Sequence, residues 1–224
     1  MDILGLILLS VFFILQSKEM FSEKKKALAN SNKSEDNTNL QYQKKIEEVC
    51  VKLLHPHAKV LQFGYSFGHA SELITSFKFN ELVIIEPIKE VFQKAKKWAK
   101  DNNSIKVFNS NIEKELPYLN NFNSIYLDCF NIKSYGGQTD FHNTINTRKV
   151  SIIIESLLLN ATSSNARFVV LFDTSQKLSI NSIYLPYLKV TQYDVDQLLD
   201  NKDDADSLYK IVVIEKKNLI NEEI

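Results

Sequence analysis

The sequence predicts an α/β domain with a doubly wound, Rossmann-like, mostly parallel sheet that ends in a C-terminal antiparallel strand pair. Short, continuously apolar runs alternate with amphipathic segments of helical period along the chain. Buried parallel strands have such continuous apolar runs, and helices connect them. A turn that contains two glycines follows the first of these runs, and the last two runs are too close together to enclose a crossover helix.

The folded domain is expected over residues 41–218, and it begins with a helix. Apolar residues spaced by three and four from Tyr42 onward predict a helix that ends before Pro56. Continuous apolar runs then predict the first three strands, at residues 59–63, 81–85 and 105–108. The segments between them have helical spacing, from about residue 70 and over residues 91–100.

The second half of the domain continues the alternation and then breaks it. Residues 124–127 and 167–172 are predicted as the fourth and fifth strands, with a helix over residues 150–159 between them. Residues 188–195 and 209–215 also have strand patterns, but only a short acidic stretch separates them. We therefore expect these two segments to form an antiparallel pair that closes the edge of the sheet.

Composition excludes several classes of protein. The chain has 224 residues with 27 basic and 27 acidic side chains, and this balance argues against a protein whose main work is to bind nucleic acid, although it allows a local basic patch. A chain of this size buries enough surface to need no disulfide or structural metal. Its two cysteines, Cys50 and Cys129, lack the spacing of a disulfide framework or a zinc site.

Residues 1–17 form an apolar N-terminal segment that favours membrane association. The charge-free run at residues 3–17 is followed by Lys18 and by lysines 24–26, which places the domain in the cytoplasm under the positive-inside rule. The run is short for a spanning helix, so a helix packed on the protein or a cleaved signal stays an alternative. A polar linker is expected over residues 18–40 and a tail over residues 219–224.

Polar residues follow four successive predicted strands. The loop from Gly64 to Gly68 lies between the first strand and a helix, where an α/β fold binds nucleotide-like ligands. Glu86 ends the second strand, 22 residues after Gly64, where a carboxylate can accept both hydroxyls of a ribose. Asn111 follows the third strand and Asp128 ends the fourth. These side chains are therefore expected at one edge of the sheet.

The same loop has the spacing Gly-x-Ser-x-Gly of a hydrolase nucleophile elbow, with Ser66 as the nucleophile. Asp173 could supply the acid, but no histidine follows His142 in the chain, which disfavours this alternative. His69 at the helix start and His142 in the loop after the fourth strand are weaker candidates for a ligand site.

Together, the glycine loop, Glu86 and Asp128 resemble class I S-adenosylmethionine-dependent methyltransferases over roughly residues 42–218. The resemblance implies S-adenosylmethionine as cofactor and methyl transfer to a nitrogen or oxygen nucleophile of an unidentified small-molecule or protein acceptor. The segments 83–86, 91–93 and 98–99 are similar to those of guanidinoacetate and arginine N-methyltransferases.

The resemblance also implies individual roles. Gln62 stands where an acid usually contacts the methionine amino group, and Ser66 replaces the middle glycine of the family's loop. Glu86 matches the acid that binds ribose, Asn111 would face the adenine amine, and Ile112 would flank the adenine ring. The implied cofactor-binding set is Gln62, Gly64, Tyr65, Ser66, Gly68, Glu86, Pro87, Asn111, Ile112 and Asp128.

Asp128 is the candidate catalytic residue, because a carboxylate orients an amine or guanidine acceptor and offsets its developing positive charge. In a metal-dependent O-methyltransferase, Asp128 and Asp173 would instead hold a divalent ion; this alternative is not favoured. An aminopropyltransferase is weakened by the single acid at this position. Gln62, Ser66 and Asn123 at unusual positions would suit a degenerate, membrane-tethered interaction module.

Overall fold

The computed structural model describes residues 40–128, 147–160, 162–173, 180–199 and 209–217. Contacts divide the chain into two units, residues 1–44 and 45–224, and the architecture below is that of the second unit. The predicted apolar segment 1–17, nearly all of the linker and the tail lie outside the described residues.

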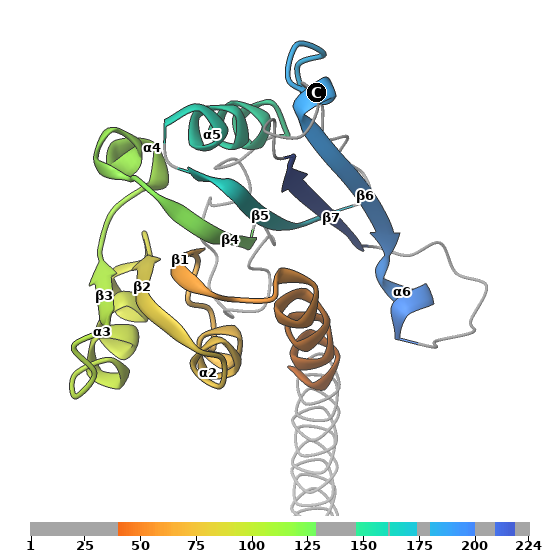
Figure 1. Cartoon of the computed structure of the whole chain (residues 1–224). Coiled ribbons are helices and arrows are strands. Elements are labelled where there is room, and N and C mark those ends of the chain that lie inside the picture. Colours follow the sequence, from red (N-terminus) through yellow and green to blue (C-terminus); the bar gives the residue numbers. More distant parts are fainter. Residues whose placement is uncertain (1–39, 129–146, 161, 174–179, 200–208, 218–224) are drawn as a thin grey trace, which may run out of the picture. The chain divides into compact units, whose positions relative to one another are not determined.

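Within the described residues, seven strands form one sheet in the order β3-β2-β1-β4-β5-β7-β6 (Figure 1). Neighbours from β3 to β5 pair in parallel, and β7 lies antiparallel between β5 and β6. The predicted fold class is therefore confirmed, including the antiparallel pairing at the C-terminus. The strands are β1 (Ala58–Phe63), β2 (Phe79–Ile85), β3 (Ile105–Phe108), β4 (Phe122–Asp128), β5 (Thr162–Asp173), β6 (Leu188–Asp194) and β7 (Tyr209–Lys216).

Helices lie on both sides of this sheet (Figure 1). The helical residues 45–54, α2 (His69–Thr75) and α3 (Lys89–Trp98) lie on one side, and α4 (Ile112–Glu115) and α5 (Thr147–Asn160) on the other. The last four residues of β1 and of β2 are all buried, so apolar side chains project from both faces of these strands. A helical layer on each face removes that apolar surface from water.

A continuous core fills the side of the sheet that α4 and α5 cover. Leu61 and Phe63 of β1 pack there with Ile112 of α4 and with Ile154 and Leu157 of α5. These residues are at most 8% exposed. The core therefore fixes β1 and the segment after β3, the elements from which the candidate site is built.

The structure differs from the sequence-based expectation where elements are short. The four residues of α4 and the 3-10 turns η1 (Leu116–Tyr118) and η4 (Leu185–Tyr187) cover too little chain for an apolar period to be recognised. Helix α6 (Val195–Leu198) is a further single turn, directly after β6. Strand β5 also begins five residues earlier than predicted, because its first residues, Thr-Ser-Ser-Asn, have no apolar run.

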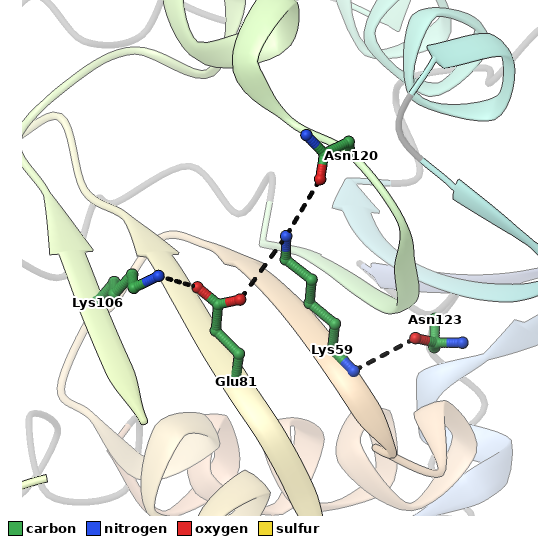
Figure 2. Close-up of polar contacts among 5 residues, drawn as sticks. All are labelled: Lys59, Glu81, Lys106, Asn120 and Asn123. Carbon is green, nitrogen blue, oxygen red and sulfur yellow. Dashed lines mark hydrogen bonds and ion pairs between the residues drawn. The ribbon is translucent and has the colours of Figure 1, made fainter. Parts of the chain in front are cut away.

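The amino ends of β1, β2 and β3 are joined by a network of opposite charges (Figure 2). Oε1 of Glu81 lies 2.5 Å from Nζ of Lys106, and its Oε2 lies 3.7 Å from Nζ of Lys59. Nζ of Lys59 donates to Asn120 over 3.4 Å, and the backbone amide of Lys59 donates to Oδ1 of Asn123 over 3.3 Å. Asn123, singled out in the sequence as unusual, therefore contributes to strand packing at this edge.

Among the described helices, none combines the length and the apolar character that crossing a membrane requires. The predicted anchor at residues 3–17 is not among these helices, because it lies outside the described residues. Membrane association stays a prediction.

Candidate active site

The glycine loop turns the chain from β1 into α2 through three residues in the left-handed region. Their φ angles are 85° at Gly64, 53° at Ser66 and 91° at Gly68. The Gly64 amide donates to the carbonyl of Ile85 on β2 over 2.9 Å, and the Gly68 amide donates to the carbonyl of Tyr65 over 2.8 Å. Glycine adopts these angles without a steric cost, whereas Ser66 does not.

Glu86 braces this loop from the end of β2. Its Oε2 accepts the backbone amide of Tyr65 and its Oε1 accepts that of Ile88, each over 2.8 Å. The residue is only 2% exposed, and this burial raises the pKa of its carboxyl group, while the amides of Tyr65, Ile88 and Ser66 lower it. An ionised carboxylate has about four acceptor positions, and the amides of Tyr65, Ile88 and Ser66 take three of them. One position is left for a ribose hydroxyl, and ribose binding stays a prediction.

Gln62 has a buried structural role that explains why an amide replaces the usual acid. Its Nε2 donates to the carbonyl of Gly64 over 2.7 Å, and its Oε1 accepts the hydroxyl of Ser71 over 2.8 Å. The side chain therefore needs one donor and one acceptor, and an ionised glutamate offers only acceptors. Gln62 ties β1, the loop and α2 together, and its contact with the cofactor stays a prediction.

Tyr65 is a packing residue of the loop that faces α3. Its ring is buried and lies 5.7 Å from the ring of Trp98, at an interplanar angle of 51°. A Cβ added to Gly68 would lie 2.6 Å from the Tyr65 hydroxyl, so any other residue there would displace the Tyr65 ring in addition to adopting an unfavourable φ. Burial, followed by the charge of Glu72, raises the pKa of Tyr65 to about 12.

The two predicted ligand residues after β3 differ in their exposure to solvent. Asn111 is exposed and precedes α4, whereas Ile112 is fully buried in the core. Asn109, which the sequence did not single out, donates its side-chain amide to the carbonyls of Glu86 over 2.9 Å and Pro87 over 3.2 Å. The roles of Asn111 and Ile112 beside an adenine ring stay predictions.

Asp128 lies beside the glycine loop at the end of β4. A Cβ added to Gly64 would lie 3.4 Å from the Cβ of Asp128, so the two predicted site elements are in contact distance. The half-buried Asp128 also raises the pKa values of Cys50 and Tyr126, for both of which burial is the larger cause. These buried groups therefore lie within the electrostatic reach of Asp128.

Glu47 is a second acid in this region, and sequence reasoning missed it. It lies on the helix over residues 40–54, is 2% exposed, and accepts the backbone amide of Ala70 at its Oε2 over 3.0 Å. Like Asp128, it raises the pKa values of Cys50 and Tyr126. Its sequence signal was a charge three residues before Cys50, on the apolar face of the helix.

The remaining candidates contribute less. Nδ1 of His69 lies 3.9 Å from Oε2 of Glu72, a pairing on the surface of α2. His142 lies outside the described residues, as does the loop that contains it. Asp173 ends β5, two positions beyond Leu171, the partner of Asp128 in the sheet. In the part of the chain that the structure describes, no group of three or more metal-ligating side chains occurs.

The family described as guanidinoacetate N-methyltransferase matches residues 37–162, more than half of the 224 residues. The chain belongs to the guanidinoacetate N-methyltransferase family. The match spans the glycine loop, Glu86 and Asp128. Among curated proteins, no sequence matches the chain.

Solved structures agree with this fold. The N-methyltransferase NodS from Bradyrhizobium japonicum WM9 has 10% identity and a TM-score of 0.56, covering 79% of this chain and 97% of its own. An rRNA methylase from Streptococcus thermophilus has 9% identity and a TM-score of 0.50, covering 76% and 93%. The plantazolicin methyltransferase BpumL in complex with SAH has 14% identity and a TM-score of 0.50, covering 84% and 88%.

The chain is therefore an S-adenosylmethionine-dependent methyltransferase of class I, as the sequence predicted. The structural neighbours have different names and acceptors, so the shared fold does not specify the acceptor. Neither the family match nor the fold supports the alternative of a membrane-tethered interaction module.

Proposed function

We propose that the chain methylates a nitrogen nucleophile of the amine or guanidine class, with Asp128 at the reacting centre. The family is named for a guanidine acceptor, and its match includes Asp128. The observation that carries the proposal is the position of Asp128 against the glycine loop. A Cβ added to Gly64 would lie 3.4 Å from the Cβ of Asp128. A nucleophile held by Asp128 would therefore lie next to the loop that binds the cofactor.

The cofactor would be held by the edge formed by β1, β2 and β3. Glu86 would accept a ribose hydroxyl, the loop from Gly64 to Gly68 would allow close approach of the ligand, and Asn111 would contact the adenine. When bound, S-adenosylmethionine supplies an electrophilic methyl group on a positively charged sulfur. The protein has only to orient the acceptor and to manage its charge and proton.

Two carboxylates give this region the charge that a nitrogen acceptor needs. Asp128 and Glu47 both disfavour ionisation of the buried Tyr126 and Cys50, which is the effect of a negative field. The same field stabilises positive charge on an acceptor nitrogen as its bond to carbon forms. Asp128 would accept a hydrogen bond from the acceptor N–H, which orients the lone pair, and would then take the released proton.

The test is a turnover assay on the full chain that measures release of S-adenosylhomocysteine. We expect turnover with guanidinoacetate, arginine or a primary amine, and none with catechol. Replacing the carboxylate in Asp128→Asn should lower kcat by about 100-fold or more, because the amide cannot take the proton. The affinity for S-adenosylmethionine, measured by calorimetry, should change by less than about threefold, which is a change in binding free energy of less than about 1 kcal/mol.

Glu81→Gln is the matched control, because it also removes one carboxylate from the end of a strand, but at the opposite edge. Its kcat should equal that of the unaltered protein. Turnover of catechol that requires a divalent ion and disappears in a chelator would contradict the proposal and favour the metal-dependent alternative. Unchanged kcat in Asp128→Asn would remove Asp128 from the reacting centre.

A further inference from the structure

A groove with a basic rim lies between the end of α3 and the edge strand β3. Its volume is about 570 Å³, and its lining includes Gln93, Lys96, Lys97 and Lys100 on the helical side and Ile105 and Val107 on β3. Strand β3 is the outermost strand of the sheet and pairs only with β2. The groove is therefore open to a ligand at the border of the sheet.

The lysines of this groove have no acidic partner among the described residues, in contrast to five other lysines of the domain. Lys52, Lys59, Lys106, Lys189 and Lys210 all form ion pairs. Lys96, Lys97 and Lys100 form none, and the one contact of Lys96 is with the Phe92 ring, 5.9 Å from its Nζ. Positions 96 and 100 are one helical turn apart, so their like charges repel each other.

This groove is separate from the candidate active site. Helix α3 begins at Lys89, three residues after Glu86, and ends at Trp98, after which the chain leads to the start of β3. Ile105, which lines the groove, begins β3, whereas the candidate cofactor residues follow the ends of the strands. A ligand in the groove would therefore not occupy the cofactor position.

We propose that this groove is a second ligand site, for the phosphate groups of a nucleoside polyphosphate. Each lysine ammonium supplies three donors to phosphate oxygens, and three of them within one helical turn match a chain of phosphates. Ile105 and Val107 line the groove and provide an apolar wall for the base. Free inorganic polyphosphate shares the same phosphate chemistry.

The proposal does not depend on the methyl acceptor, and it is tested by binding to the full chain. Trp98 is the single tryptophan of the sequence, lies next to Lys97 and contacts the Tyr65 ring, so its fluorescence reports on the end of α3 and on the glycine loop. The variants below distinguish the two. We expect ATP and tripolyphosphate to bind and adenosine alone not to bind. Tighter binding of ATP than of tripolyphosphate identifies a nucleoside polyphosphate as the ligand, and equal binding overturns that assignment in favour of free polyphosphate.

The decisive variant is the triple change Lys96→Gln, Lys97→Gln and Lys100→Gln. It should weaken binding of both phosphate ligands by about tenfold per lysine, as expected for charge-assisted hydrogen bonds. All three side chains are exposed, so folding should be unaffected, and the thermal unfolding midpoint without ligand checks this.

A second triple variant, Lys78→Gln, Lys89→Gln and Lys94→Gln, is the matched control, because it removes the same charge from exposed positions outside the groove. Its loss of affinity should stay below about threefold, as screened charges at a distance contribute little. An equal loss in the two triple variants would overturn the site. So would ATP binding that is lost in Glu86→Ala but kept in the groove variant, because ATP would then occupy the cofactor position.

Discussion

Two glutamates, one on β2 and one directly after it, lie five residues apart at opposite edges of the sheet and have different partners. Glu81 at the amino end contacts Lys59 and Lys106, and these partners lower the pKa of its carboxyl group (Figure 2). Glu86 at the carboxyl end contacts only backbone amides among its described partners, and burial raises the pKa of its carboxyl group. The same residue type therefore has two different functions at the two ends of one strand.

The difference separates a structural edge from a functional one. At the amino edge, Glu81 is paired with two lysine side chains and contributes to the packing of the strands. At the carboxyl edge, Glu86 and Glu47 accept backbone amides. Asp128 and Glu47 raise the pKa of the buried Tyr126. A buried carboxylate with a raised pKa, such as Glu86, is typical of functional sites. Chemical activity is therefore expected at the carboxyl edge alone.

The largest expected effect that tests this comparison is on cofactor affinity. Glu86→Ala should weaken S-adenosylmethionine binding by about 30-fold or more, since it removes charge-assisted hydrogen bonds to the ribose and the brace of the glycine loop. Calorimetric titration of the full chain measures this change. Glu81→Ala, at the other end of β2, should leave the affinity unaltered.

Equal affinities in the Glu86 and Glu81 variants would place the ribose elsewhere and would break the comparison. A thermal unfolding scan accompanies the titration, because Glu86 also accepts the amides of Tyr65 and Ile88. A folded Glu86→Ala protein with lost binding separates the ligand role from the structural one.

A smaller effect is expected on the pH dependence of stability. The lowered pKa of Glu81 means that its ion pairs stabilise the fold above the ordinary carboxyl value of 4.5, and that this contribution is lost as the pH falls through the folded-state pKa. The raised pKa of Glu86 has the opposite sign. The stability that the protonated Glu86 contributes to the fold is fully present below pH 4.5 and is lost as the pH rises through the folded-state pKa.

Denaturant unfolding of the unaltered protein, Glu81→Gln and Glu86→Gln from about pH 3 to about pH 8 measures both contributions, each on the order of 1 kcal/mol. The stability advantage of the unaltered protein over Glu81→Gln should grow with pH. Its advantage over Glu86→Gln should shrink or reverse with pH. Parallel curves for the two variants would show that the two edges do not differ electrostatically.

The sheet and the edge that carries the site were predictable from sequence because they follow from local patterns. Apolar runs fixed the strands, and the rule that parallel strands end at one edge brought Gly64, Glu86 and Asp128 together. The insertion of β7 between β5 and β6 was not predictable, because either order satisfies two adjacent apolar strands.

The side-chain contacts of the site were less accessible from sequence. Glu47 lies 81 residues before Asp128, and nothing in the local pattern connects the two. The pairing of Gln62 with both Gly64 and Ser71 is likewise a tertiary contact, so the substitution looked like a defect in the motif. A motif departure can therefore be a local hydrogen-bond requirement and not a loss of function.

The smallest effect concerns the second departure, Ser66, which has a counterpart at the opposite edge. Ser66 has a φ of 53° in the glycine loop, and Asn121 has a φ of 57° just before β4. A left-handed conformation costs a serine about 1 kcal/mol, whereas asparagine tolerates it. A glycine destabilises the folded state by about 0.5 to 1 kcal/mol, because it loses more conformational entropy on folding. Ser66→Gly should therefore be stabilising by about 0.5 kcal/mol or neutral, and Asn121→Gly should be slightly destabilising.

Denaturant unfolding measures the free energy of unfolding of Ser66→Gly and Asn121→Gly. The two values can be compared when the free energy falls with denaturant concentration at the same slope in both variants. The cofactor affinity of Ser66→Gly should stay within about twofold, because the backbone amide that lowers the pKa of Glu86 is retained. A larger loss of stability in Ser66→Gly than in Asn121→Gly would mean that the buried serine side chain stabilises the loop by more than its backbone strain costs. In that case the serine, like Gln62, is a requirement of the loop and not a tolerated substitution.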